Sequence, residues 1–351
     1  MSWTVGYDPV GRIISFNAPG NFSGFAYDVN GNRLSSTHVV GGQTSSRTYT
    51  VGDASNHLTG FNLKMGGITA SVSYRYNANG DMTSDGLRRY SYDAEGRLSA
   101  VTSGATDASP TTRYAHNALG QRVFKTEPLY PPAEGDESNP GFMRGLVSFF
   151  SKIWGPSASD AEKLGFAFMY DEEGTLISEA GTGGANSTGS TQYIYLPTSS
   201  GPMPIVAVID GTKYAVHSDH LNTPRRLTDA TGRPVWQWGY SAFGDEKPTH
   251  AKNRFANLDL TPSPGTTNIS PVVFNLRHPG QYDDEESGLY YNLHRSYDSR
   301  TGRYSQPDPI GLDGGWNRFS YVSANPLSFA DPLGLLQGMR QRPAEVMLFE
   351  G

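Results

Sequence analysis

The sequence has no cysteine, few charged residues and no long apolar run. Without cysteine there can be no disulfide framework, no thiol nucleophile and no cysteine-ligated zinc site. Charged residues make up 18% of the 351 positions, the net charge is -6, and lysine and arginine form no run. A surface that binds nucleic acid through clustered cations is therefore not expected.

Targeting and membrane signals are also missing. The N-terminus lacks the basic-then-apolar pattern of a signal peptide. No stretch of the sequence approaches the roughly 18 to 20 apolar residues that a membrane-spanning helix needs. The sequence by itself leaves the localisation unknown, and export would need a dedicated machine or an upstream segment.

Turn formers and aromatic residues are what the chain has in quantity. It contains 41 glycines and 23 prolines together with 20 tyrosines and 16 phenylalanines. Many short turns with aromatic residues between them favour strands over long helices. We therefore expect an all-β fold.

One short unit recurs along the chain and predicts stacked β-hairpins. An aromatic residue or histidine is followed by Asp or Asn, two variable residues and Gly, usually with Arg one or two places later. In such a unit the aromatic residue ends a strand, Asp or Asn accepts backbone hydrogen bonds in the turn, and Gly supplies a positive φ. Because one hairpin cannot bury its face alone, the units are expected to stack into a continuous curved sheet. Copies begin at Tyr7, Tyr27, Tyr76, Tyr92 and His116, a looser copy begins at Tyr170 and a stretched one at Tyr297.

The repeats divide the chain into four predicted parts. Hairpin repeats occupy residues 1–126, and a second repeat region occupies 166–335. Residues 127–165 combine a Pro-rich loop with one short amphipathic helix, which would pack against the sheet or contact a membrane or partner. Residues 336–351 form a C-terminal tail.

The repeat pattern resembles the tyrosine-aspartate repeats of the Rhs family of bacterial polymorphic toxins and of the C components of insecticidal toxin complexes. Residues 166–335 resemble the Rhs repeat-associated core, on the motifs at 217–229, 238–244, 279–292 and 302–304 together with two Asp-Pro-x-Gly elements. The resemblance implies a hollow β-shell, here a curved and partial one. It also implies a secreted or cell-surface location and a partner that is a toxin cargo or a complementary shell-forming chain.

The two Asp-Pro-x-Gly elements, at Asp308 and Asp331, are the candidate chemistry. Asp, Pro and Gly at these positions also suit an ordinary type I turn, and Asp8-Pro9-Val10-Gly11 has the same form inside a plain repeat. In the Rhs family, however, the final element marks a self-cleavage site. The resemblance implies that Asp308, Asp331 and Arg295 are catalytic and that the bond between Leu335 and Leu336 is cut.

Two carboxylates held close together cannot both ionise easily, so the pair can act as acid and base on one peptide bond. An arginine beside them would orient a carboxylate or stabilise charge on the carbonyl oxygen. Either aspartate fits either role. At most, then, the chain is an intramolecular aspartic-type autoprotease, and no cofactor is expected.

The tail after Leu335 is only sixteen residues long. We therefore expect this chain to be a C-terminal shell segment without a toxin domain of its own, whether or not cleavage releases the tail. Because a closed shell needs more repeats, open sheet edges would favour self-association or a partner strand.

Three other interpretations compete. His217, Asp219 and His220 could suggest a metal site, although adjacent residues of a strand point to opposite faces, and no metal is expected. A non-catalytic adhesion module would bind through exposed aromatic residues such as Trp236 and Trp238. A displaced, non-functional cassette fragment would have no selected activity.

Overall fold

The computed structural model describes residues 3–53, 55–104, 106, 108–130, 160–250 and 272–335. The predicted amphipathic helix at residues 142–154 and the tail 336–351 lie outside these ranges. In the described part of the chain nearly all regular structure is β, and the helical elements are three short 3-10 helices: η1 (Asp160–Lys163), η3 (Gly311–Gly314) and η4 (Val322–Ala324). The all-β prediction is confirmed.

The N-terminal sheet has seven strands that pair in chain order, each antiparallel to the next. Its strands are β1 (Thr4–Tyr7), β2 (Ile13–Ala18), β3 (Asn21–Tyr27), β4 (Arg33–Val40), β5 (Gln43–Val51), β6 (Leu58–Met65) and β7 (Ile68–Ser73).

A second sheet continues the same up-and-down order over fourteen strands. Its strands are β8 (Arg75–Tyr76), β9 (Met82–Ser84), β10 (Arg89–Tyr92), β11 (Leu98–Thr102), β12 (Thr111–His116), β13 (Arg122–Thr126), β14 (Gly165–Tyr170), β15 (Leu176–Gly181), β16 (Ser190–Thr198), β17 (Gly201–Ile209), β18 (Thr212–Ser218), β19 (Pro224–Thr228), β20 (Pro234–Gln237) and β21 (Thr249–His250).

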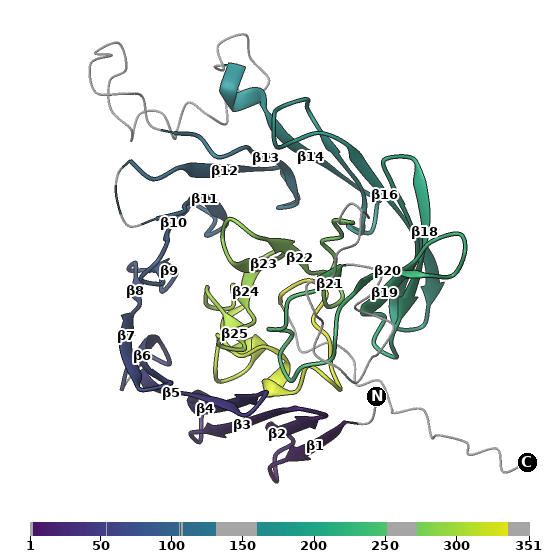
Figure 1. Ribbon diagram of the computed structural model, residues 1–351. Coiled ribbons are helices and arrows are strands. Elements are labelled where there is room, and N and C mark those ends of the chain that lie inside the picture. Colours follow the sequence, from purple (N-terminus) through teal and green to yellow (C-terminus); the bar gives the residue numbers. More distant parts are fainter. Residues whose placement is uncertain are drawn as a thin grey trace, which may run out of the picture.

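A third sheet of four strands follows, with β22 (Tyr282–Asp284), β23 (Leu289–Asn292), β24 (Arg295–Asp298) and β25 (Arg303–Tyr304). Figure 1 shows the two long sheets following one another as a curved wall, with β22–β25 in the region that the wall surrounds. The wall is not a closed barrel, because its end strands β1 and β21 are not paired with each other in the described part of the chain. A curved, partial shell is thus confirmed, and its interior is occupied by the chain's own C-terminal sheet.

The repeat predicts the hairpin turns correctly. In the first copy the Gly11 N–H donates to the Asp8 carbonyl at 3.0 Å, and the Asp8 N–H donates to the Arg12 carbonyl at 3.0 Å. Gly11 has a φ of 89°, a region that glycine enters without steric cost. The pairing register shifts by one residue at Tyr7, as expected for a turn followed by a bulge. The copies at Tyr27, Tyr76, Tyr92, His116 and Tyr170 make the same two turn hydrogen bonds.

The repeat tyrosines also join neighbouring hairpins. The hydroxyl of Tyr27 donates to the carbonyl of Ile13, one hairpin earlier, and that of Tyr92 donates to the carbonyl of Met82. The repeat arginine forms its hydrogen bond to the following hairpin instead: Nη1 of Arg12 donates to the carbonyl of Asp28 in the next repeat. Hydrogen bonds of this kind contribute about 1 kcal/mol each. The aromatic residue and the arginine of the repeat therefore fix the stacking of hairpins, beyond forming each turn.

Packing between the wall and the inner sheet creates the main core. A cluster of buried side chains joins Tyr193 and Trp236 of the wall to Phe274, Tyr297 and Tyr304 of the interior. Hydroxyls of the inner sheet also reach the wall, as when Tyr297 donates to the carbonyl of Phe243 at 2.9 Å. The inner sheet is consequently held in a fixed position, and β24 carries the arginine of the candidate site.

Candidate functional site

The first Asp-Pro-x-Gly element forms a tight turn under the inner sheet. The Asp308 carbonyl accepts a hydrogen bond from the Gly311 N–H at 3.0 Å, and Gly311 has a φ of 70°. Oδ1 of Asp308 accepts the N–H of Ile310 at 3.1 Å. The Asp308 N–H donates to the carbonyl of Arg318 at 2.8 Å, which ties the turn to the following loop. One carboxylate oxygen is therefore used by the turn, and Oδ2 is left for other contacts.

The second element is built in a similar way but sits against β23. Oδ1 of Asp331 accepts the N–H of Leu335 at 3.1 Å, and the carbonyl of Asp331 accepts Nδ2 of Asn292 at 2.9 Å. Gly334 has a φ of 70°, and a Cβ there would lie 2.5 Å from the carbonyl oxygen of Asn292. Only glycine fits this position without displacing β23.

Arg295 connects the two turns. Its Nη2 lies 2.9 Å from Oδ2 of Asp308 and 3.3 Å from Oδ2 of Asp331. Its Nη1 donates to the carbonyl of Arg318 at 3.1 Å, and its Nε donates to the carbonyl of Gly334. The structure therefore brings together the three residues that the resemblance implies to be catalytic, although they are 36 positions apart at the extremes.

All three side chains are withdrawn from solvent. Exposure is 1% for Asp308 and 3% each for Asp331 and Arg295. Burial raises the pKa of the Asp308 carboxyl above its ordinary value; the Arg295 guanidinium opposes this rise, and the Asp331 carboxylate adds to it. For the neighbouring His294 imidazole, burial and the charge of Arg295 both lower the pKa. The environment thus favours a protonated Asp308 and a neutral His294.

Two further residues touch the site, and the sequence did not predict them. The Tyr304 hydroxyl donates to Oδ2 of Asp331 at 2.8 Å, and the Tyr304 ring lies 3.7 Å from Cζ of Arg295. Asn292 donates to both the Tyr304 hydroxyl, at 2.8 Å, and the Asp331 carbonyl. Burial, together with the nearby Asp331, raises the pKa of Tyr304 well above its usual range, so the hydroxyl stays protonated. The signal for Tyr304 in the sequence is its position directly after Gly302-Arg303. Nothing in its local sequence distinguishes it from the other tyrosines.

The chain around the predicted cleavage point is held on both sides of one peptide group. Arg295 donates to the Gly334 carbonyl, and the N–H of Leu335 donates to Asp331. Leu335 is therefore fixed beside Asp331, whereas Leu336 lies outside the described residues. Two acidic groups, a cation and a restrained backbone are components that can act in the hydrolysis of a nearby peptide bond.

The Asp8 turn shows how this site differs from the common repeat. Asp8 accepts a hydrogen bond from Nε of Arg12 at 2.6 Å, within its own hairpin and near the surface. No second carboxylate appears in that arrangement among the described contacts. The four-residue motif is thus an ordinary turn, and the pairing through Arg295 is what distinguishes Asp308 and Asp331.

The His217 to His220 segment is arranged differently from what the sequence suggested. β18 ends at Ser218, so Asp219 and His220 lie in a turn and not on opposite faces of a strand. Asp219 pairs with Arg225 at 2.9 Å, His217 contacts Thr228, and His220 contacts the carbonyl of Leu327. Across the described ranges no group of three or more His, Asp or Glu side chains is placed to hold a metal ion.

The aromatic residues named for adhesion are not surface residues. Trp236 is 0% exposed and Trp238 is 1% exposed. Trp236 packs edge-on against Phe274 at 5.1 Å between centroids, so it belongs to the core that joins the wall to the interior. The expectation that these two side chains are exposed was wrong, because strand alternation does not reveal that the inner face is covered.

Comparisons with known proteins relate the chain to bacterial toxins. It is 29% identical over 365 residues to the double-stranded DNA deaminase toxin A of Burkholderia cenocepacia, covering 97% of this chain and 21% of that protein. It is 38% identical over 120 residues to the toxin protein Tse5 of Pseudomonas aeruginosa, covering 34% of this chain and 8% of that protein. No protein-family model matches the chain.

The fold resembles that of a solved toxin complex. A structure of the Photorhabdus luminescens Tc holotoxin pore with a TccC3 variant matches 97% of this chain and 17% of the solved chain, with a TM-score of 0.56 at 15% identity. This chain spans about a fifth of the length of the deaminase toxin, and its match covers 8% of Tse5. No helix in the described ranges is long and apolar enough to cross a membrane.

Proposed function

We propose that this chain, which is of the Rhs type, forms the C-terminal part of a toxin-system β-shell and cuts its own backbone between Leu335 and Leu336. The observation that carries the proposal is the contact of one guanidinium nitrogen of Arg295 with both Asp308 and Asp331. Relationship to toxins supports the setting, and the buried carboxylate pair supports the chemistry.

The two aspartates have different surroundings, which suggests different roles. Asp331 accepts hydrogen bonds from the hydroxyl of Tyr304, Nη2 of Arg295 and the N–H of Leu335. Asp308 has fewer such contacts, and its pKa is raised. We assign Asp331 as the base and Asp308 as the acid.

Hydrolysis then proceeds with one water molecule. Asp331 accepts a proton from the water as its oxygen bonds to the carbonyl carbon of Leu335, and Arg295 helps to neutralise the negative charge that develops. Asp308 gives its proton to the nitrogen of Leu336 as the carbon–nitrogen bond breaks. The products are a carboxylic acid on Leu335 and an amine on Leu336, and the proton of the new acid then passes to the amine or to solvent. Asp331 is left protonated and Asp308 ionised, and transfer of one proton from Asp331 to Asp308 restores the starting state.

The intact mass of freshly purified protein tests this directly. Wild-type protein should consist of a chain ending at Leu335 and a peptide of residues 336–351. Asp331→Asn should abolish this cleavage while keeping the turn, because Asn also suits the first turn position. Asp8→Asn is the matched control: it changes the same kind of turn without touching Arg295 and should cleave normally. An uncut wild-type chain would remove the enzymatic proposal.

A further inference from the structure

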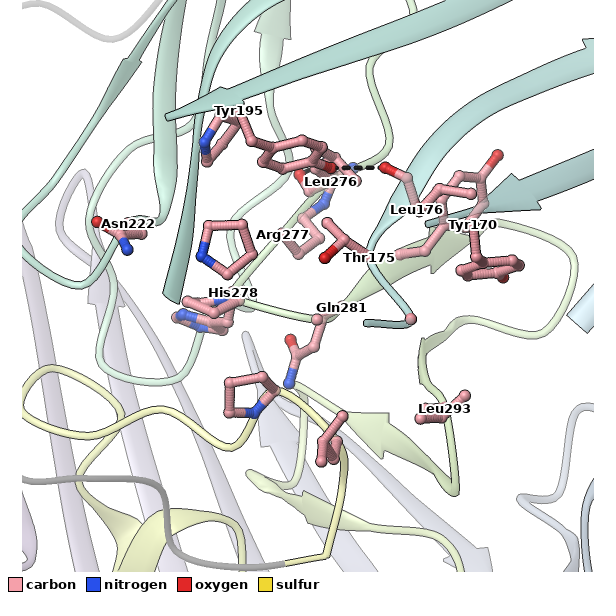
Figure 2. A pocket seen from close by; sticks show the side chains of 18 of the residues that line it. Tyr170, Thr175, Leu176, Tyr195, Asn222, Leu276, Arg277, His278, Gln281 and Leu293 are labelled. Carbon is pink, nitrogen blue, oxygen red and sulfur yellow. Dashed lines mark hydrogen bonds between the residues drawn. The ribbon is translucent and has the colours of Figure 1, made fainter. Parts of the chain in front are cut away.

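A cavity of about 210 Å³ lies between the wall and the inner sheet, next to the turn that begins at Asp331. Most of the side chains that line the cavity are apolar or aromatic. Figure 2 shows the cavity, around which Tyr170, Leu176, Tyr195, Leu276 and Leu293 are arranged. Two residues of the turn itself, Pro332 and Leu333, complete the lining.

Several polar side chains in this lining have buried atoms without hydrogen-bond partners in the described part of the chain, and Gln281 is the one whose whole amide is unpaired. Gln281 is 1% exposed, and neither its Oε1 nor its Nε2 has a partner among the described residues. A buried amide without partners is costly, so such groups are normally paired. The NH2 donors and the carbonyl acceptor of this amide, both bonded to Cδ, match the carbonyl and N–H of an extended peptide backbone.

The two arginines in the lining are already paired with carboxylates. Arg122 pairs with Asp284, and Arg277 pairs with Asp283. Burial keeps the pKa of His278 well below its usual range, so that side chain is neutral. An anionic ligand such as a phosphate would therefore find no free cation here, whereas an uncharged peptide with an apolar side chain would fit.

The nearest source of such a peptide is the chain itself. The described residues end at Leu335, two positions after Leu333, and an extended chain advances roughly 3.3 to 3.6 Å per residue. The next residues are Leu336, Gln337, Gly338 and Met339, which carry no charge and include two large apolar side chains. We propose that residues 336–339 bind in this cavity and pair with Gln281. The proposal goes beyond cleavage and does not depend on it.

Disulfide trapping in the full-length chain tests the proposal, because the natural sequence has no cysteine. Met339→Cys is combined with Thr175→Cys, a position in the cavity lining whose side chain is partly exposed. The matched control combines Met339→Cys with Ala118→Cys. Ala118 lines a second, more open cavity near the Asp308 turn, which His294, Pro309 and Arg318 also line. Mass spectrometry detects the bond whether or not the backbone is cut, because a cut but cross-linked chain is one water heavier than an uncut one.

Trapping at Thr175→Cys should exceed trapping at Ala118→Cys by about tenfold, since binding raises the local concentration of the tail in one cavity only. Gln281→Leu, which keeps the side-chain volume, and Leu176→Trp, which fills the apolar space, should each reduce it several-fold. Circular dichroism checks that every variant is folded. Equal trapping at the two positions, or trapping that neither cavity variant reduces, would overturn the proposal.

Discussion

At the scale of single residues, Tyr304 is the strongest addition to the candidate site. Tyr304→Phe removes the hydroxyl that contacts Asp331 but keeps the ring against Arg295. Hydrogen bonds to charged groups are worth about 1.5 to 3 kcal/mol, so cleavage should slow by about ten- to a hundredfold. The rate is measured by mass spectrometry after uncut chain, isolated under denaturing conditions before it can fold and cleave, is refolded by dilution. Tyr297→Phe is the control, because among the described residues the Tyr297 hydroxyl donates to the Phe243 carbonyl and makes no hydrogen bond to the site. Equal rates for both variants would contradict the assignment.

The acid role of Asp308 predicts a pH dependence with a definite sign. Burial raises the pKa of its carboxyl, so the protonated form that donates to the leaving nitrogen persists above the usual carboxyl range. As pH rises through this raised pKa the protonated fraction falls, and the cleavage rate should fall with it. The refolding assay across mildly acidic to neutral pH measures this. A rate that increases steadily over the same range would instead indicate that Asp308 acts as a base.

At the scale of elements, the turn that carries Asp331 depends on a close approach of backbone at Gly280. Gly280 has a φ of 80°, and a Cβ there would lie 1.9 Å from the carbonyl oxygen of Pro332. Gly232 has a φ of 78° with nothing near a Cβ, so Gly232→Ala measures the backbone cost alone, roughly 1 to 2 kcal/mol. Gly280→Ala should cost roughly 1 to 3 kcal/mol more and should slow cleavage, because Pro332 must move. Denaturant unfolding and the cleavage assay check both effects, and equal losses in the two variants would argue against the close approach.

How far the sequence predicts these elements depends on how local their causes are. The repeat turns were predicted because Asp8, Gly11 and Arg12 satisfy one another within five residues. The burial of Trp236 was not predicted, since it results from contact with Phe274, nearly forty residues later in the chain. The resemblance to the Rhs family supplied Arg295, Asp308 and Asp331, but their meeting at one guanidinium follows from the packing of the inner sheet.

At the scale of the whole molecule, the wall and the inner sheet are joined by a buried ion pair. Arg122 of β13 contacts Asp284 of β22, and each side chain is 2% exposed. The guanidinium also lies 4.4 to 5.4 Å from the ring centres of four aromatic residues, which come from both the wall and the interior: Tyr114, Phe168, Tyr282 and Tyr291. The pair therefore couples the fold of the interior, and with it the candidate site, to the wall.

Removing one partner of this pair should destabilise the assembly of wall and interior. Asp284→Asn leaves Arg122 buried without its counter-charge, which costs about 3 to 5 kcal/mol. Asp229→Asn, in a pair with the half-exposed Arg233, should cost no more than about 1 kcal/mol. Shifts of the denaturation midpoint measure both.

The double variant Arg122→Met with Asp284→Leu should recover much of the loss, because well-packed apolar residues can replace a buried pair. If Asp284→Asn were as mild as Asp229→Asn, the attachment of the inner sheet to the wall would not depend on this contact.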